Sequence, residues 1–421
     1  DPERLFEAPN GCVLIKQVPL LAPSGQRGHI AMLFTSLLKS IVQEGSICVV
    51  DPSGNRETVG DGSAPEVTLR VSSKAAGVGL LLNPALKVGE AYMDGHLVVE
   101  QGSIYNFLDI VARNYATQRN RPALDLLESL VGALRYVNPV ERSRHNVRHH
   151  YDLSSVLYDT FLDDDRNYSC AYFKRPDDTL ETAQENKKRH IAAKLQLNRP
   201  GLKVLDIGSG WGGLGLYLAE EFGADVTGVT LSTEQQTLSA QRAARSPARD
   251  RLRFELRDYR EVEGPYDRIV SVGMFEHVGK RHYRQFFSRV RHLLADNGLA
   301  LVHSIGYADT PAPINPFMRK YIFPGAELPS LSEVCAVVER SGLWATDIEI
   351  LRLHYADTLR LWRERFLGQW NDVKTLYDER FCRMWEYYLA LCEIGFRRRT
   401  NMVFQLQIAK RVDAAPITRD Y

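Results

Sequence analysis

The feature that most restricts the fold of this chain is a regular alternation of strand-like and helix-like segments from about residue 200 onward. Apolar runs such as LKVLDIG, DVTGVTL and YDRIVSVG are separated by amphipathic stretches of helical period. Because parallel strands require crossover connections, this alternation predicts an α/β fold with a doubly wound parallel sheet. Residues 307–390 interrupt it with a loop and aromatic-rich helices, and NMVFQLQIAK (401–410) is expected to return to the sheet.

The first 115 residues show a different pattern, typical of a small α+β domain. We expect a helix within 28–44, a hairpin turning at 52–55 and a strand over 66–73. A helix within 74–86 should stop at Pro84, a strand should follow in 91–102, and a helix should begin after the capping residue Ser103. A polar linker over 116–148 would then lead to a catalytic domain over 149–421.

Composition excludes several classes of protein. The chain has 53 Lys and Arg against 52 Asp and Glu in 421 residues, so a nucleic-acid or other polyelectrolyte partner is not indicated. No apolar run reaches the roughly 18 residues of a membrane span, and the first residues resemble no leader peptide. The six cysteines have no zinc-type spacing, so we expect no metal site and a cytoplasmic location.

The segment VLDIGSGWGG (204–213) is the main candidate for a ligand site. Gly208, Gly210 and Gly212 form a turn at which ligand atoms can approach the backbone beside a helix N-terminus. The next strand ends in Thr230 and Leu231, without the acid that grips a dinucleotide ribose. Asp206 before the turn suits the ammonium of a methyl donor, which favours S-adenosylmethionine over NAD, although a tight turn without ligand remains an alternative.

Several longer motifs resemble one family, the cyclopropane-fatty-acid and mycolic-acid cyclopropane synthases. They are HHYDLSSVLYDTFLDDDRNYSCAYF, VLDIGSGWGG, GVTLSTEQ, DRIVSVGMFEHVG, LVHSIG, KYIFPGAELPS and HYADTLRLWRERF, in the family's order over 145–410. The resemblance implies a class I S-adenosylmethionine-dependent methyltransferase fold with a helical acyl-binding insertion. It also implies that the first domain is similar to the sterol-carrier-like domain of the phospholipid-acting members.

The resemblance assigns donor-binding roles to residues on four segments. In this family the second strand ends in Thr-Leu-Ser, so neutral hydrogen bonds replace those of the missing carboxylate. The implied donor-binding positions are Tyr168, Ser169, Gly208, Gly210, Gly212, Thr230, Leu231, Gln235, Tyr259 and Arg260, beside the Asp206 inferred above.

The implied reaction places demands on the rest of the site. Attack of an alkene on a sulfonium methyl leaves a carbocation, which needs aromatic faces and a dry cavity. By the resemblance, a bound bicarbonate then acts as base, held by Cys170, Glu276, His303, the backbone of Ile305, and Tyr355. Taken singly, these residues could equally be a buried thiol, a helix cap, a structural histidine and a core tyrosine.

The same resemblance implies an acyl tunnel and contact with a membrane. Segment 315–325 and the aromatics Trp362, Phe366, Trp370, Tyr377, Trp385, Tyr387 and Tyr388 would line the tunnel, or else form an ordinary aromatic core. The basic runs at 141–150 and 187–190 could meet anionic headgroups or be solvated faces. We expect peripheral association with the inner membrane surface, unsaturated phospholipid acyl chains as substrate, and a homodimer.

Three other functions compete with cyclopropane synthesis. A sister methyltransferase could leave a methyl or methylene branch on the acyl chain. A nucleic-acid methyltransferase is disfavoured because the position after the fourth strand reads GMFEHVG and not Asp/Asn-Pro-Pro-aromatic. A lipid carrier with an inactive donor fold would have no use for the glycine turn and the anion-site residues.

Overall fold

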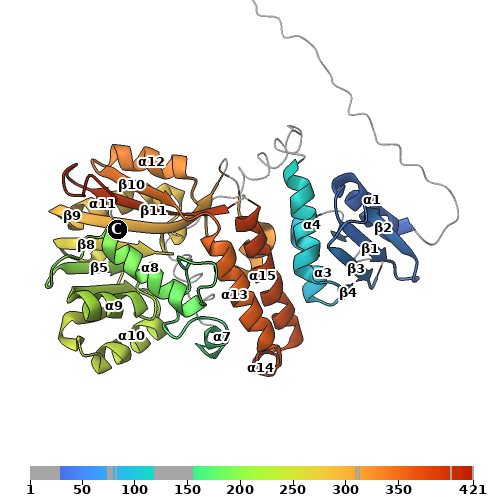
Figure 1. The fold of residues 1–421 in the computed structure, drawn as a ribbon, viewed down its shortest axis with the longest axis horizontal. Coiled ribbons are helices and arrows are strands. Elements are labelled where there is room, and N and C mark those ends of the chain that lie inside the picture. The colour runs from blue at the N-terminus through green and yellow to red at the C-terminus, as the bar shows by residue number, and fades with distance from the viewer. Residues whose placement is uncertain are drawn as a thin grey trace, which may run out of the picture.

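The computed structural model describes residues 29–73, 79–80, 83–117, 155–308, 311, 313–398 and 401–419. Two separate sheets organise these residues, and a group of long helices lies between them (Figure 1). The predicted linker 116–148 lies outside the described residues, except for the last residues of helix α4.

The larger sheet has seven strands in the order β10-β11-β9-β8-β5-β6-β7. Strands β7, β6, β5, β8 and β9 are mutually parallel, whereas β11 pairs antiparallel with both β9 and β10. This confirms the doubly wound fold and the return of the last strand to the sheet. The strands are β5 (Lys203–Ile207), β6 (Asp225–Thr230), β7 (Leu252–Leu256), β8 (Tyr266–Val272), β9 (Leu294–Tyr307), β10 (Trp344–Ile350) and β11 (Asn401–Ala409).

Helices cover both faces of this sheet because successive residues of each strand point to opposite sides. Val204 packs into a core with α8 (Leu180–Lys194), α9 (Gly213–Phe222) and α10 (Thr233–Arg245). Leu205 and Ile207 pack into the opposite core with α11 (Tyr283–Leu293) and α12 (Leu331–Arg340). The carboxyl ends of the parallel strands are left open at one edge, where doubly wound folds bind ligands.

The smaller sheet has the order β2-β1-β3-β4 and includes one parallel pair, β1 with β3. The expected hairpin at 52–55 is present between β1 and β2. The expected cap is also present, since the N–H of Asn106 donates to Ser103 Oγ at 3.1 Å. The elements are α1 (His29–Ile41), β1 (Ser46–Val50), β2 (Arg56–Gly60), β3 (Glu66–Val71), α3 (Pro84–Met93), β4 (Leu97–Gln101) and α4 (Ile104–Thr117).

Three predictions about element boundaries are wrong. Pro84 does not stop a helix but begins α3, where its missing N–H costs nothing. The strand expected in 91–102 starts only at Leu97, because α3 continues to Met93. The interruption predicted for 307–390 contains a strand of the main sheet, β10, which pairs with β11.

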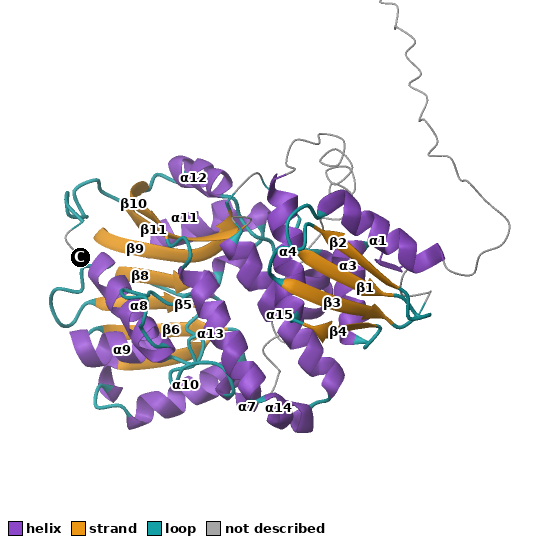
Figure 2. Ribbon diagram, turned by 45° about the vertical axis from the view of Figure 1, so that its right-hand side comes forward, coloured by secondary structure: helices purple, strands orange, loops and turns teal. Residues whose placement is uncertain are grey.

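The remaining helices are α7 (Ser155–Asp159), α13 (His354–Gly368), α14 (Trp370–Leu376) and α15 (Glu379–Arg397). Of these, α13, α14 and α15 pack together, and α15 contacts the small domain. Helix α15 packs along α3 and α4, and Figure 2 shows it between the two sheets. Tyr92 Oη donates to Glu386 Oε2 at 2.6 Å, and Arg398 Nε donates to Asp109 Oδ1 at 2.8 Å. The small domain is therefore bound to the catalytic one by both packing and polar contacts.

One glycine sets how closely α3 approaches the catalytic part. A Cβ on Gly89 would lie 2.4 Å from Phe317 Cδ2 and 2.8 Å from Tyr387 Cε1. We expect Gly89→Ala to lower the free energy of unfolding by about 1–3 kcal/mol, a typical cost of overpacking. Urea denaturation measures this, with Gly368→Ala as control because nothing lies within 4 Å of that position. An unchanged midpoint for Gly89→Ala would show that the two parts do not pack as described.

No helix among the described residues is both long and apolar enough to cross a bilayer.

Candidate functional site

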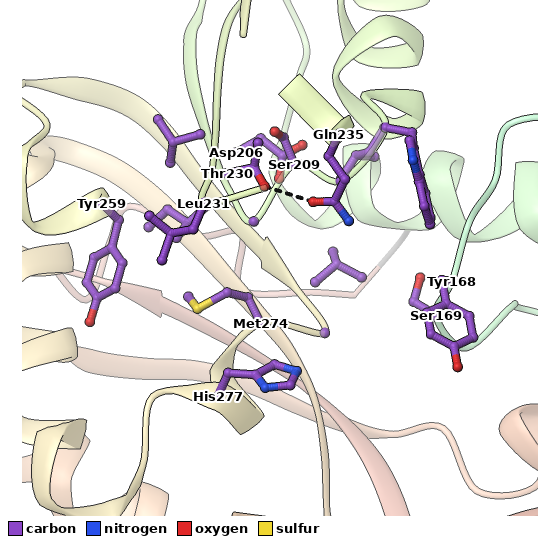
Figure 3. A pocket seen from close by; sticks show the side chains of 18 of the residues that line it. Tyr168, Ser169, Asp206, Ser209, Thr230, Leu231, Gln235, Tyr259, Met274 and His277 are labelled. Atoms are coloured by element: carbon purple, nitrogen blue, oxygen red, sulfur yellow. Dashed lines mark hydrogen bonds between the residues drawn. The ribbon is translucent and has the colours of Figure 1, made fainter. Parts of the chain in front are cut away.

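A pocket opens at the carboxyl edge of the large sheet, beside β5, β6 and β8 (Figure 3). Its walls come from the segment before α8, the glycine turn, the end of β6, the turn around η2 (Tyr259–Glu261), and the residues that flank η3 (Phe275–His277) together with its last residue. Ten of the eleven donor-binding residues predicted from the sequence line this pocket, and Gly212 does not. The ten are Tyr168, Ser169, Asp206, Gly208, Gly210, Thr230, Leu231, Gln235, Tyr259 and Arg260.

The glycine turn has the conformation that its sequence suggests. Gly208, Gly210 and Gly212 have φ of 84°, 55° and 84°, a region that residues with a Cβ rarely adopt. At Gly208 a Cβ would also lie 2.7 Å from Met274 Cβ, so the wall there has no room for a side chain. Gly212 instead caps the N-terminus of α9, where a Cβ would lie 2.9 Å from Ser239 Cβ. It shapes the turn without forming the pocket wall.

Asp206 is the main electrostatic feature of the pocket. Its side chain is buried, and within the described residues its Oδ2 has no hydrogen-bond partner. Burial raises the pKa of Asp206 to about 7, and the charge of Lys187 opposes this only in part. A buried carboxylate without a partner is costly, so this position favours a ligand that brings a positive charge.

The other pocket residues are held by contacts of their own. Thr230 Oγ1 donates to Gln235 Oε1 at 2.8 Å, which fixes the two side chains across the end of β6 (Figure 3). Arg260 is held by Asp258 through Nε at 2.8 Å and Nη2 at 2.5 Å. Figure 3 shows Tyr168 and Ser169 on one side of the pocket and Tyr259 on the other. The pocket can therefore enclose a ligand between a polar wall and an aromatic one.

Sequence reasoning missed a buried cation, Lys187, in the pocket wall. Its side chain is 2% exposed, and Nζ donates to Ser169 Oγ at 2.9 Å and to Asn167 Oδ1 at 3.2 Å. Burial lowers the pKa of Lys187 to about 8, partly offset by Asp163. The run KKRH (187–190) was expected to face solvent or headgroups. That expectation is wrong for Lys187 and also for Lys188, which is buried against Asp165.

Glu276 and Ile305 of the predicted anion set are in direct contact. The Ile305 N–H donates to Glu276 Oε1 at 2.6 Å, while Oε2 is buried and has no partner within the described residues. Burial raises the pKa of Glu276 to about 7, although the hydrogen bond from Ile305 lowers it. The Ile305 N–H thus fixes one oxygen of the carboxyl group, and Oε2 accepts no hydrogen bond within the described residues.

His303 lies two residues before Ile305 on the same strand and is also buried. It lies inside β9, which continues to Tyr307. A hydrogen bond of 3.2 Å joins His303 Nδ1 to Gln405 Nε2 on β11. Burial lowers the pKa of His303 to about 3, and the charge of Lys187 adds to this effect. The imidazole is therefore neutral at physiological pH.

Cys170 and Tyr355 lie in the apolar cluster that packs against Ile305. Cys170 Sγ donates to Ala171 O at 3.3 Å, and burial raises the pKa of the thiol, which keeps it protonated. The Tyr355 ring lies 5.8 Å from that of Trp362 and 4.7 Å from that of Phe396. The structure thus brings Glu276 and Ile305 into contact, with His303 two residues away on β9, and it places Cys170 and Tyr355 in the aromatic cluster against which Ile305 packs.

That aromatic cluster reaches the donor pocket through Tyr168. Tyr168 Oη and Tyr388 Oη are 2.6 Å apart, and the Tyr168 ring lies 5.2 Å from that of Trp362. Of the aromatics predicted to line an acyl tunnel, Trp370 and Tyr377 are partly buried. The others are fully buried in the same cluster: Trp362, Phe366, Trp385, Tyr387 and Tyr388. Such π faces can stabilise a cation, and their burial excludes water.

Comparisons with known proteins agree with this arrangement. A family model described as mycolic acid cyclopropane synthetase matches residues 139–406. The chain is 36% identical to the cyclopropane-fatty-acyl-phospholipid synthase of Escherichia coli K12 over 353 residues, which is 84% of this chain and 90% of that protein. It is 39% identical to the tuberculostearic acid methyltransferase UfaA1 of Mycobacterium tuberculosis over 277 residues, 63% of this chain and 65% of that protein.

A solved structure adds a third comparison. The mycolic acid cyclopropane synthase CmaA1, crystallised in complex with SAH and CTAB, superposes with a TM-score of 0.60 and 34% sequence identity. The alignment covers 65% of this chain and 99% of that one.

Proposed function

The chain belongs to the mycolic acid cyclopropane synthetase family, and from this membership and the site we propose that it is a cyclopropane-fatty-acyl-phospholipid synthase. It would transfer a methylene group from S-adenosylmethionine to the cis double bond of an unsaturated acyl chain in a phospholipid. The observation that carries the proposal is the combination of a buried Asp206 in the donor pocket, whose Oδ2 has no partner within the described residues, with an aromatic cluster beside it.

The donor pocket fits S-adenosylmethionine, which supplies an electrophilic methyl group on a sulfonium centre. The donor's ammonium would take the unpartnered Oδ2 of Asp206. The glycine turn lets the ligand approach the backbone, while Thr230 and Gln235 present neutral hydrogen-bonding groups at the end of β6. Tyr259 and Arg260 would flank the adenine on the opposite side.

The aromatic cluster would stabilise the positive charge that develops on the acyl chain. Trp362 and Tyr355 are packed edge to face, and Tyr168 links them to the donor pocket. Because the cluster is buried, water that would quench a carbocation is excluded. The apolar aromatics of α13 and α15 would continue this surface as the acyl tunnel.

We also propose that the anion set holds bicarbonate, which when bound supplies the base for ring closure. The residues fit such a group because Glu276 Oε2 is buried without a partner and the neighbouring His303 is neutral. Cys170 and Tyr355 would close the site on the side of the aromatic cluster, and Ile305 fixes the Glu276 carboxyl group. A protonated thiol there adds no negative charge that could repel an anion.

Label transfer tests the proposed function. The protein is incubated with methyl-labelled S-adenosylmethionine and vesicles of a mono-unsaturated phospholipid, with fully saturated vesicles in parallel. Labelled acyl chains should appear only with the unsaturated lipid, since the reaction needs a double bond. Donor binding without label in any lipid would contradict the proposal and favour a lipid carrier with an inactive donor fold.

Lys187 should affect donor binding although it was not recognised from the sequence. Replacing it by Met leaves Ser169 Oγ and Asn167 Oδ1 without their donor and loosens the wall that carries Tyr168. We expect the affinity for S-adenosylhomocysteine (SAH), the demethylated form of the donor, to fall about tenfold, which is typical when charge-assisted hydrogen bonds are lost. Calorimetry measures this. Lys194→Met is the control, because Lys194 is equally buried but pairs with Glu349 outside the donor pocket.

A second candidate activity produces a branched chain in place of a ring. The identity to a tuberculostearic acid methyltransferase supports it, because that relative is named for methyl transfer. Both reactions would share the donor pocket and the cation-stabilising cluster. The complete anion set favours ring closure in this chain.

Membrane association, dimerisation and the role of the small domain belong to the proposal as well. We propose peripheral contact with a phospholipid surface on the cytoplasmic side and a homodimer formed through the sterol-carrier-like domain. The contacts of α3 and α4 with α15 support a role for this domain in supporting the acyl-binding helices. The basic run at 141–150, expected to meet headgroups, lies outside the described residues.

A further inference from the structure

A second pocket lies apart from the donor site and has a strongly basic lining. It encloses about 540 Å³ and is lined by Tyr172, Phe173, Lys174, Arg189, His190, Ala193, Arg352 and His354. Among these described lining residues there are three permanent cations and two histidines, and there is no carboxylate. Such a lining fits an anionic ligand.

The pocket wall is a rigid aromatic stack. The Tyr172 ring stacks on His190 at 4.3 Å and on His354 at 4.6 Å, with interplanar angles of 23° and 22°. The Phe173 N–H also donates to His354 Nδ1 at 3.1 Å. Segment 172–173, helix α8 and the start of α13 are thereby held together. These packed side chains form part of the wall of an open pocket.

The acids around the pocket are engaged by other groups. Glu349 accepts a hydrogen bond from His190 at 2.6 Å and forms an ion pair with Lys194 at 2.5 Å. Asp178 Oδ2 accepts from the backbone N–H of residues 174 and 175, at 2.8 and 3.1 Å. Glu185 is paired with Arg189 at 2.7 Å. Among the described residues, Lys174 and Arg352 are therefore the cations of the lining whose side chains form no ion pair with these acids.

Arg352 is placed at the pocket in an unfavourable backbone conformation. Its φ of 44° lies in the left-handed region, which Gly and Asn adopt far more readily than Arg. Its charge is close enough to the stack to act on both rings. Burial lowers the pKa of His354, and Arg352 also lowers it, against the opposing charges of Glu349 and Asp357. Burial and the charge of Glu349 raise the pKa of Tyr172, and Arg352 opposes this rise. The first turn of α13, which begins at His354, adds N–H groups that favour an anion.

The pocket adjoins the reaction site through three segments. His190 lies on α8 one turn after Lys187 of the donor pocket. His354 directly precedes Tyr355, and Tyr172 follows Cys170 by two residues. Tyr172 and Phe173 also pack against the aromatic cluster, so the second pocket lies beside the part of the site that would hold the acyl chain.

From these observations we propose that the second pocket binds the phosphate group of the lipid substrate through Lys174, Arg352 and the first turn of α13. The inference rests on the proposed function, because it assumes a phospholipid substrate. It goes beyond that function by assigning a headgroup site separate from the donor pocket. The same chemistry could also bind free inorganic phosphate, and the experiment distinguishes the two.

Binding is measured directly with a soluble lipid. Dihexanoyl phosphatidylglycerol below its micelle concentration is titrated into the full chain and followed by phosphorus NMR, with inorganic phosphate in parallel. The variants are Lys174→Gln and Arg352→Asn, the second chosen because Asn tolerates the left-handed backbone. Arg249→Gln is the control, since Arg249 is 69% exposed and far from the pocket lining.

We expect each of the two variants to weaken binding of the short-chain lipid about tenfold, the typical loss for one charge-assisted contact. SAH affinity should stay unchanged in both, which shows that the fold and the donor pocket are intact. Inorganic phosphate should bind at least tenfold more weakly than the lipid. Unchanged lipid binding in both variants would overturn the proposal, and so would inorganic phosphate binding as tightly as the lipid.

The test separates this inference from the proposed function. Wild-type protein that transfers no label to lipid, yet binds the short-chain lipid through Lys174 and Arg352, would contradict the function and support the headgroup site. If the wild type transfers label to lipid but both variants bind the short-chain lipid as tightly as the wild type, the result would support the function and contradict the headgroup site.

Discussion

Replacing Glu276 by Gln should reduce turnover on the order of 10³-fold while leaving SAH affinity within a factor of about three. The Ile305 N–H fixes an oxygen of the side chain on one side, so the amide nitrogen of Gln must face the cavity where Oε2 now lies. A hydrogen-bond donor would then replace an acceptor against the O–H of a bound bicarbonate. Steady-state label transfer measures turnover, and calorimetry with SAH measures the donor site.

A neighbouring carboxylate provides the control for this variant. Glu327 lies next to Glu276 and accepts a hydrogen bond from the Lys280 N–H at 2.9 Å, but it belongs to neither the donor pocket nor the anion set. Glu327→Gln should leave turnover within about threefold of wild type. If Glu276→Gln were as active as Glu327→Gln, the anion-site assignment would be wrong.

Replacing Asp206 by Asn should weaken SAH binding about 100-fold. The neutral amide keeps the shape of the side chain but removes the charge that would pair with the donor's ammonium, an interaction worth roughly 1.5–3 kcal/mol. Methylthioadenosine, which lacks the amino-acid end of SAH, should bind both proteins equally. The control variant is Asp225→Asn, because Asp225 lies at the opposite end of β6 and pairs with Arg251.

The same residue predicts how donor binding depends on pH. Burial raises the pKa of Asp206 to about 7, so the ionised form that binds the ammonium is lost as the pH falls below that value. We expect the wild-type affinity for SAH to decrease about tenfold between pH 8 and pH 6, and that of Asp206→Asn to change little over this range. Equal pH profiles for the two proteins would contradict the assignment.

In the absence of the donor, the contribution of Asp206 to protein stability should increase as the pH falls, whereas the affinity for SAH decreases. Because the folded-state pKa of Asp206 lies above its unfolded value, the folded state binds more protons between about pH 4 and pH 7. The contribution of this group to stability is therefore full at low pH and is lost as the pH rises through 7. The Asn side chain does not ionise, so Asp206→Asn avoids this loss of stability. At pH 8 the donor-free variant should therefore melt at a higher temperature than the donor-free wild type.

The core of the fold and the donor pocket could be predicted because their signals are local. The alternation of strands and helices, the glycine turn and the Thr-Leu-Ser end of β6 are each contained in a few consecutive residues. The pocket accordingly includes Asp206, Gly208 and Thr230 as expected. Gly212 has the same local signal but caps α9, because the position of one glycine within a turn depends on how the helix packs against Phe254.

The features that were missed depend on residues far apart in the sequence. Lys187 appears in a basic run, and it is buried because Asn167 and Ser169 offer it oxygens from another segment. Proline can end a helix or begin one. Pro84 begins α3, and α3 packs against α15, which is far away in the sequence. The second pocket combines residues from positions 172 to 354 and has no motif of its own.

The most direct test of the account is the structure of the lipid product. The protein is incubated with labelled S-adenosylmethionine and vesicles of a mono-unsaturated phospholipid, and the released fatty acids are analysed by mass spectrometry and proton NMR. We predict a labelled chain one CH₂ heavier with upfield cyclopropyl protons and no vinyl protons. A labelled chain that retains vinyl protons, or carries a methyl branch without a ring, would contradict cyclopropane synthesis.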